Sequence, residues 1–185
     1  LMYISTDYVF NGEGERPWEP DDKVTTPLNE YGYAKYLGEQ AVQKYVKDFY
    51  IVRIAWVFGI NGKNFVKTML NVGKNHDTVR VVNDQIGTPT YTFDLARLLV
   101  DMIETDKYGI YHATSWYDFT CEIYRQAGYT TNVVPVTTEE YGLSKAKRPE
   151  NSRLNKSKLV ENGFKPLPDW KDALARYIEI LNKEN

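Results

Sequence analysis

Tyr31-Gly-Tyr-Ala-Lys35 and the earlier run Tyr3-Ile-Ser-Thr6-Asp-Tyr-Val-Phe10 are the two stretches that decide the fold of this chain. The earlier run is apolar and β-rich, which predicts a buried strand that ends in a Ser-Thr pair and a turn. Tyr31 follows Thr6 by 25 residues. Tyr31 and Lys35 are spaced i, i+4, so on a helix they share one face.

Together these stretches supply a hydroxyl, a phenol and an ammonium group. A cation beside a phenol stabilises the phenolate and lowers the pKa of the phenol from about 10. Such a set can protonate a carbonyl oxygen while a cofactor delivers hydride to the carbon. The Tyr-x-x-x-Lys pattern alone is weakly specific, since the chain has 15 tyrosines. A strand-end cap at Thr6 and a helix-packing role for Tyr31 are the alternative interpretation.

The composition is that of a globular protein with one domain or slightly more: 185 residues, 26% charged and 42% hydrophobic. A net charge of −2 gives no basic footprint for nucleic acid. No apolar run reaches the roughly 18 residues of a membrane span, and no signal peptide is recognisable. The single Cys121 excludes an internal disulfide, which fits a cytoplasmic location. We expect Cys121 to be a buried core thiol.

Strand and helix patterns alternate along the chain, which indicates an α/β fold with a parallel sheet. The loop over residues 11–29 is long, rich in Gly, Pro and acidic residues, and is expected to be solvated. A divalent-ion role for its acids is less favoured, and no pattern indicates Mg²⁺ or another metal. Strands are predicted at 1–5, 49–54, 79–82, 110–113 and 132–136, and helices at 31–45, 64–72, 92–104, 116–126, 156–162 and 170–181.

Six blocks in order carry a family resemblance. They are ISTDYVF (4–10), PLNEYGYAKYLGE (27–39), RIAWVFG (53–59), NFVKTML (64–70), VVNDQIGTPTY (81–91) and KRPENS (147–152). With these blocks the chain resembles the dTDP-4-dehydrorhamnose reductase family of extended short-chain dehydrogenase/reductases over about residues 2–183.

The resemblance implies a Rossmann-like parallel sheet, completed by residues 1–85, and a smaller α/β substrate-binding lobe, mainly residues 86–185, interleaved with the first. Family members begin with a strand, a Gly-rich turn and a helix that bind the cofactor pyrophosphate. Leu1 already lies in what resembles a mid-sheet strand, so we expect that part to be missing from this chain. The chain by itself is then expected to bind NADPH poorly and to be inactive. Its exposed sheet edge would favour association, and a homodimer stays open.

By the same resemblance, the protein reduces the C4 ketone of dTDP-4-dehydro-β-L-rhamnose to dTDP-β-L-rhamnose with NADPH, for polysaccharide biosynthesis. NADH is the alternative cofactor. Thr6, Tyr31 and Lys35 would be catalytic, and together with Trp56 they would bind the cofactor. The substrate, a dTDP-sugar, would contact Tyr8, Trp56, Asn64, Gln85, Thr90 and Arg148.

Several of these residues also have a structural interpretation. Trp56 can fill the core, Asn64 can simply cap a helix, and the basic cluster Lys145, Lys147 and Arg148 can be a solvated loop. Arg53, His76 and His112 are expected to be structural. Arg53 needs a partner within an apolar strand, and the histidines lack metal-ligand spacing.

Two other function classes stay open. Proteins of this family also serve as the non-catalytic, NADP-binding regulatory subunit of methionine adenosyltransferase. A related nucleotide-sugar epimerase, reductase or 4,6-dehydratase is the other alternative. A dehydratase needs an acid pair after the catalytic Thr, whereas here Asp7 is followed by Tyr8.

Overall fold

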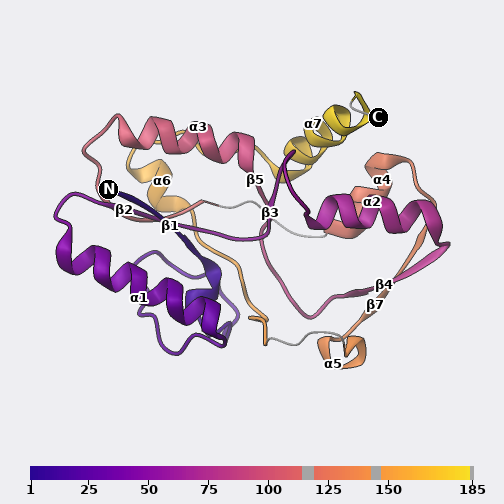
Figure 1. Cartoon of the computed structure of the whole chain (residues 1–185), viewed down its shortest axis with the longest axis horizontal. Coiled ribbons are helices and arrows are strands. Elements are labelled where there is room, and N and C mark those ends of the chain that lie inside the picture. Colours follow the sequence, from indigo (N-terminus) through magenta and orange to yellow (C-terminus); the bar gives the residue numbers. More distant parts are fainter. Residues whose placement is uncertain (114–118, 143–146, 184–185) are drawn as a thin grey trace.

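The computed structural model describes residues 1–113, 119–142 and 147–183. Its helices and strands form two groups, and several segments of the chain pass between them at the centre of the molecule. The two chain ends lie in different groups (Figure 1). One group is built on a three-stranded sheet and the other on a two-stranded sheet. In the described residues all strand pairs are parallel. The predicted α/β fold with parallel strands is therefore confirmed.

The first group is a sheet with the strand order β1-β2-β6. On one face, aromatic and aliphatic side chains of the three strands pack with Leu95, Leu98 and Met102 of helix α3. Helix α1 lies along the opposite side of the strands (Figure 1). The elements of this group are β1 (Met2–Thr6), the short 3₁₀ helix η1 (Asp7–Val9), α1 (Glu30–Tyr45), β2 (Tyr50–Ile54), α3 (Thr92–Ile103), β6 (Gly109–His112) and α6 (Ser157–Glu161).

The second group pairs two strands and covers them with helices. Val66, Ile123 and Leu174, each from a different helix, are fully buried in its core. A short strand pair between the groups joins residues that follow β2 to residues that precede α3. The elements are β3 (Val57–Phe58), α2 (Phe65–Asn75), β4 (Thr78–Val82), β5 (Thr90–Tyr91), α4 (Phe119–Ala127), β7 (Asn132–Val136), α5 (Thr138–Tyr141) and α7 (Trp170–Lys183).

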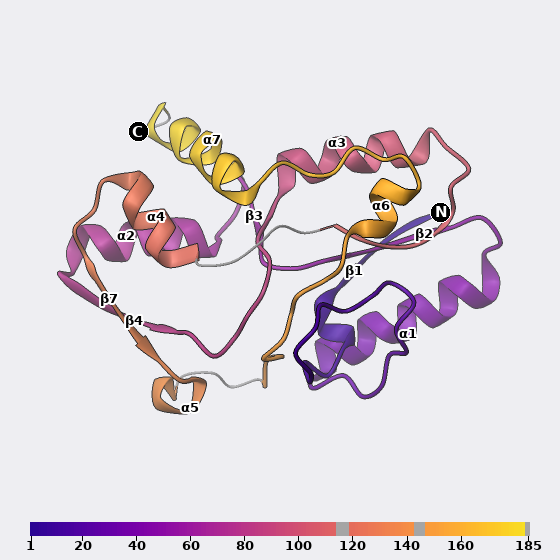
Figure 2. The same ribbon diagram turned by 180° about the vertical axis from the view of Figure 1, so that it is seen from behind.

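The chain passes between the two groups more than once. Strand β4 pairs with β7 in the second group, whereas β6, which comes later than β4, returns to the first sheet beside β2. Seen from behind, the segment that leads into α6 runs between the groups back to the first one (Figure 2). The groups are thus interleaved in sequence, and a functional division near residue 85 stays a prediction.

Each predicted element agrees with a described one to within three residues at each end, apart from the predicted helix at 116–126, whereas the short elements η1, β3, β5 and α5 were not predicted. The first residues of that predicted helix, 116–118, lie outside the described residues, as does Lys145 of the basic cluster. The expectation for Cys121 is wrong, because this thiol is exposed. The buried face of α4 is formed by its neighbours, among them Phe119, Ile123 and Tyr124, so Cys121 points away from that core.

Arg53 has the partner that its buried position requires. Its guanidinium donates two hydrogen bonds to the Glu39 carboxylate, at 2.9 and 2.7 Å, and one to the Pro20 carbonyl. Both side chains of the ion pair are almost completely buried. Burial, and the nearby Arg53 cation, lower the pKa of His112 well below 6.5, so its imidazole is neutral. The pair joins α1 to β2 and fixes the helix on the sheet.

The long loop over residues 11–29 is held by a second segment, residues 149–155. Trp18 stacks on Phe10, with ring centroids 4.5 Å apart, and its backbone pairs with Arg153 and Asn155. Asn151 donates to the carbonyls of Gly14 and Arg16. None of the helices in the described part of the chain is long and apolar enough to cross a membrane.

Candidate active site

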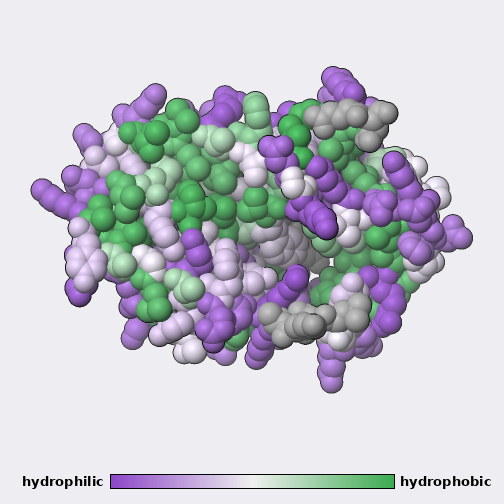
Figure 3. Space-filling view, in the orientation of Figure 1, coloured by the Kyte–Doolittle hydropathy of each residue, from purple (hydrophilic) through white to green (hydrophobic). Residues whose placement is uncertain are grey.

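A cavity of about 1160 Å³ lies between the two groups of elements. The space-filling view shows the surface hollowed between the part that contains α1 and the part that contains α2 (Figure 3). The cavity is lined by residues from the carboxyl ends of β1 and β2, the first turns of α1, and the strands β4 and β7, together with residues of α2, α4 and α5. In open α/β sheets, ligands bind outside the carboxyl ends of the strands. The cavity therefore lies where a substrate is expected.

Helix α1 begins against the end of β1 because of Gly32. A Cβ at this position would lie 2.1 Å from the carbonyl oxygen of Tyr8, so no larger residue permits this approach. Asn29 caps the helix by accepting a hydrogen bond from the Gly32 N–H at 2.9 Å. The glycine between the two tyrosines of the motif therefore brings Tyr31 beside the strand end.

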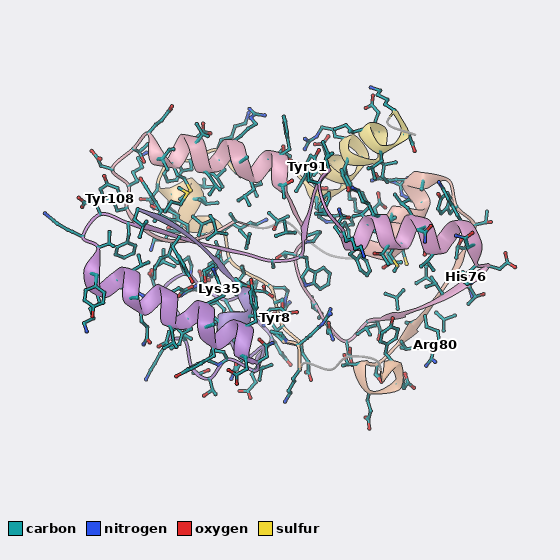
Figure 4. All side chains as sticks on the ribbon, viewed as in Figure 1. Tyr8, Lys35, His76, Arg80, Tyr91 and Tyr108 are labelled. Carbon is teal, nitrogen blue, oxygen red and sulfur yellow. The ribbon has the colours of Figure 1, made fainter. Side chains whose placement is uncertain are left out.

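The predicted catalytic residues Thr6, Tyr31 and Lys35 all line this cavity. Tyr31 is 57% exposed, and its ring meets the edge of the Tyr8 ring with centroids 5.9 Å apart. Lys35 holds its ammonium group 4.1 Å above the Tyr3 ring, in a cation–π contact. Figure 4 shows Lys35 and Tyr8 close together at the end of α1 that faces the hollow.

Trp56 enters the cavity from the end of β2, and its backbone is unusual. It is the only non-glycine residue in the described part of the chain with a positive φ, 45°. Such strain persists only where the surroundings enforce it. The carbonyl of Trp56 accepts a hydrogen bond from the Thr90 N–H at 3.1 Å, and its indole packs against Gly87.

Two further predicted contacts, Gln85 and Arg148, also line the cavity. The amide of Gln85 donates to the Thr138 hydroxyl at 2.9 Å, which ties the loop after β4 to helix α5. Arg148 lies near Tyr8: burial raises the pKa of the Tyr8 phenol, and the Arg148 cation opposes this rise.

Two other predicted contacts, Asn64 and Thr90, lie outside the cavity lining. Asn64 caps α2 and donates to the Gly59 carbonyl and the Tyr177 hydroxyl. The Thr90 hydroxyl is buried and donates to the Ala55 carbonyl at 2.7 Å. Both side chains thus form hydrogen bonds within the protein itself.

Among the residues of the cavity wall that were not predicted as site residues are Asp7, Arg80 and Ser152. Arg80 extends from β4 near α5 (Figure 4), and its guanidinium donates to the Glu140 carbonyl. A cation on a strand that is otherwise apolar was the available signal for Arg80. Asp7 and Ser152 lie within two of the motif blocks, but only the fold brings them together.

The donor set of the cavity suits carbonyl chemistry. One end holds a buried hydroxyl, a phenol and an ammonium group, and the other holds the Arg80 cation among apolar side chains such as Val133 and Pro135. A phenol and an ammonium group beside a strand end can protonate and polarise an oxygen. The apolar side chains of the walls fit a ring of the ligand, and the few cations fit an anionic group.

The sequence matches the protein family described as RmlD substrate binding domain over residues 1–183. The chain belongs to this family. Among the relatives of this RmlD-family chain, the spore coat polysaccharide biosynthesis protein SpsK of Bacillus subtilis (strain 168) is 43% identical over 183 residues, covering 96% of this chain and 63% of SpsK. The dTDP-4-dehydrorhamnose reductase of Escherichia coli (strain K12) is 38% identical over 199 residues, covering 98% of this chain and 65% of that protein.

A crystal structure of dTDP-4-dehydrorhamnose reductase (RfbD) from Bacillus anthracis str. Ames in complex with NADP is similar with a TM-score of 0.89 at 41% identity. The match covers 96% of this chain and 64% of that one. The predicted resemblance to this reductase family is confirmed. The RmlD-family chain spans slightly less than two thirds of the length of these relatives.

Proposed function

We propose that the protein reduces the C4 ketone of a dTDP-linked 6-deoxy sugar, dTDP-4-dehydro-β-L-rhamnose, to dTDP-β-L-rhamnose, with NADPH as the reductant. The observation that carries this proposal is one cavity that brings Thr6, Tyr31 and Lys35 together with Trp56 and Arg148. The names of the relatives in E. coli and B. anthracis support the same reaction.

Each proposed role follows from the chemistry of the side chain. Tyr31 donates the proton that the C4 oxygen acquires, and Thr6 forms a hydrogen bond with that oxygen. Lys35 supplies a positive charge on the same helix face as Tyr31, beside the oxygen that is protonated. Trp56 packs an aromatic face against the sugar, and Arg148 offsets the charge of the diphosphate. Tyr8 and Gln85 complete the sugar-facing wall.

The residues present fit the nicotinamide half of NADPH. Lys35 and Tyr31 can donate to ribose hydroxyls, and the Ser5 hydroxyl beside them is buried without a hydrogen-bond partner among the described residues. NADPH, when bound, supplies the hydride for C4. Residues 1–185 contain no Gly-x-Gly-x-x-Gly turn for a pyrophosphate, so this chain offers no such motif for the other half.

Two alternatives differ in substrate or in function. One relative, from Streptomyces niveus, is named dTDP-4-keto-6-deoxy-D-glucose reductase and is 37% identical, so a different 4-keto sugar is the second candidate substrate. A non-catalytic regulatory subunit of methionine adenosyltransferase is less favoured, because the complete acid/base set lines the cavity. A cytoplasmic location and a homodimer stay predictions.

Loss of NADPH absorbance tests the proposal when the full gene product meets dTDP-4-dehydrorhamnose generated in situ. Rapid oxidation of NADPH is expected, and the same assay with dTDP-4-keto-6-deoxy-D-glucose ranks the two substrates. NADPH that binds but is not oxidised with either sugar would refute the reductase. In that case, co-purification with methionine adenosyltransferase would identify the regulatory role.

A further inference from the structure

A buried carboxyl group lies beside the hydroxyl that the proposed reaction uses. Asp7 is 3% exposed and follows Thr6 at the end of β1, where both residues line the cavity. The Thr6 hydroxyl donates a hydrogen bond to Oδ1 of Asp7 at 2.9 Å. The other oxygen, Oδ2, has no hydrogen bond of normal geometry with any described residue, although the Ser152 hydroxyl lies near the carboxyl group.

This hydrogen bond limits what Thr6 can do. A hydroxyl group has one proton to donate and two lone pairs to accept with. In the structure the proton goes to Asp7, and one lone pair accepts the Tyr8 N–H at 3.3 Å. Only a lone pair remains for a ligand in the cavity. Thr6 can then accept from the hydroxyl of an alcohol, but it cannot donate to the oxygen of a ketone.

Protonation of Asp7 reverses this polarity. The carboxylic acid then donates a hydrogen bond to Thr6 Oγ1, whose two lone pairs accept from Asp7 and from the Tyr8 N–H. The Thr6 O–H no longer points to Asp7 and can donate a hydrogen bond to a ligand in the cavity. We propose that Asp7 is a positioning residue that acts through Thr6: its neutral form makes Thr6 a donor for the ketone, and its ionised form makes Thr6 an acceptor for the alcohol. This inference rests on the proposed function.

The surroundings of Asp7 allow both forms near neutral pH. Burial raises the pKa of its carboxyl from 3.8 to about 6, and this rise is limited by the nearby Ser152 hydroxyl and by hydrogen bonds from Thr6 and from the backbone. The other titratable or charged groups nearby come from three segments: Tyr8 from the same turn, Tyr31 and Lys35 from α1, and Arg148 from the segment before Ser152.

Initial rates of ketone reduction and alcohol oxidation by the full gene product, from about pH 5 to about pH 9, test the proposal. Above the pH at which Asp7 titrates, reduction by the wild type should fall about tenfold per pH unit, while oxidation should rise through the titration and level off. Asp7→Asn should remove both of these inflections. As a matched control, Asp22→Asn alters the partly buried loop carboxylate that pairs with Arg16 and should keep the wild-type profile. Inflections that persist in Asp7→Asn would overturn the proposal.

A double-mutant cycle separates a role through Thr6 from an independent role. If Asp7 acts only through the Thr6 hydroxyl, adding Asp7→Asn to Thr6→Val should change the rate less than about twofold. Losses that add in the double variant would overturn the proposal. If Asp7→Asn does not fold, Ser152→Ala provides the second test. It removes the nearby hydroxyl that favours the carboxylate, so both inflections should move to higher pH, and inflections that stay in place would contradict the proposal.

The assays distinguish failure of the proposed reductase function from failure of the proposed role of Asp7. Absence of reduction by the wild type would refute the proposed function and, with it, this inference. Reduction by the wild type with a pH profile that is indifferent to Asp7 and Ser152 would refute the inference alone.

Discussion

The indole ring of Trp56 lies in the space that a side chain at position 87 would occupy. A Cβ on Gly87 would be 2.4 Å from the nearest ring atom of Trp56. Both residues line the cavity, and Trp56 holds a left-handed backbone with φ 45°. The orientation of the proposed sugar-facing ring is thus set by a glycine 31 residues later in the chain.

Replacing Gly87 with Ala should therefore displace Trp56. Overpacking of this kind costs about 1–3 kcal/mol, and we expect KM for the dTDP-sugar to rise about tenfold as the ring leaves its place. Tryptophan fluorescence should change in the ligand-free protein. As a control, Gly73→Ala creates a similar clash with Tyr129, 2.7 Å from the added Cβ, outside the cavity lining. An unchanged KM in Gly87→Ala would show that the glycine does not set the site.

The sequence predicts correctly those positions that follow from local geometry. Helical spacing brings Tyr31 and Lys35 to one face, and the end of a parallel strand brings Thr6 to the ligand edge of the sheet. The sequence does not show whether a polar side chain faces a ligand or the backbone. Asn64 and Thr90 are expected from a polar stretch to be ligand residues. In the fold they donate to the Gly59 and Ala55 carbonyls, and their contact with a substrate stays a prediction.

Contacts between segments that are distant in the chain could also not be predicted from the sequence. Ser152 meets Asp7 only because residues 149–155 bind both the 11–29 loop and the backbone of Ile86. Cys121 was expected in the core because cysteine is usually buried. The helix instead buries the residues on either side of it, Thr120 and Glu122, and the Glu122 carboxylate is paired with Arg125. Because a charged residue, Glu122, lies on the buried face, the pattern of apolar and polar residues does not show which face of α4 is buried.

Tyr31→Phe should remove most turnover while it leaves binding of the dTDP-sugar nearly intact. Loss of a general acid costs about 10²–10⁴ in rate, and the ring that contacts Tyr8 is kept. Tyr33→Phe is the matched control, because Tyr33 is exposed, lies two residues further along α1 and is not part of the cavity wall. Near-normal kcat in Tyr31→Phe, or an equal loss in Tyr33→Phe, would refute the assigned role.

Glu39→Gln should destabilise the protein strongly. It leaves the Arg53 cation buried beneath α1 without its carboxylate, and breaking a buried pair in this way costs about 3–5 kcal/mol. The unfolding free energy from urea titration measures the effect. Glu179→Gln breaks an exposed pair with Lys183 and should cost less than about 1 kcal/mol. Similar losses in the two variants would contradict the structural role of the buried pair.

Thr90→Val should cost stability and shift the Trp56 backbone. The variant removes the hydroxyl that donates to the Ala55 carbonyl at 2.7 Å, and a buried carbonyl without its donor costs about 1–3 kcal/mol. Thr90→Ser keeps the hydroxyl and should retain most of the stability. If Thr90 contacted the substrate directly, Thr90→Val would instead raise KM with no change in the urea midpoint.

Asp7→Asn should stabilise the protein at neutral pH. The pKa of the carboxyl is 3.8 in its usual environment and about 6 in the fold, so between these values the native state holds more protons than the unfolded state. The unfolding free energy of the wild type therefore falls as the pH rises through this window, by roughly 3 kcal/mol in total. An asparagine carries no charge and avoids this loss. The variant should gain on the wild type as the pH rises from about 4 to about 7, and urea titrations across that range measure the difference. A difference that is constant with pH would show that Asp7 does not titrate in the folded protein.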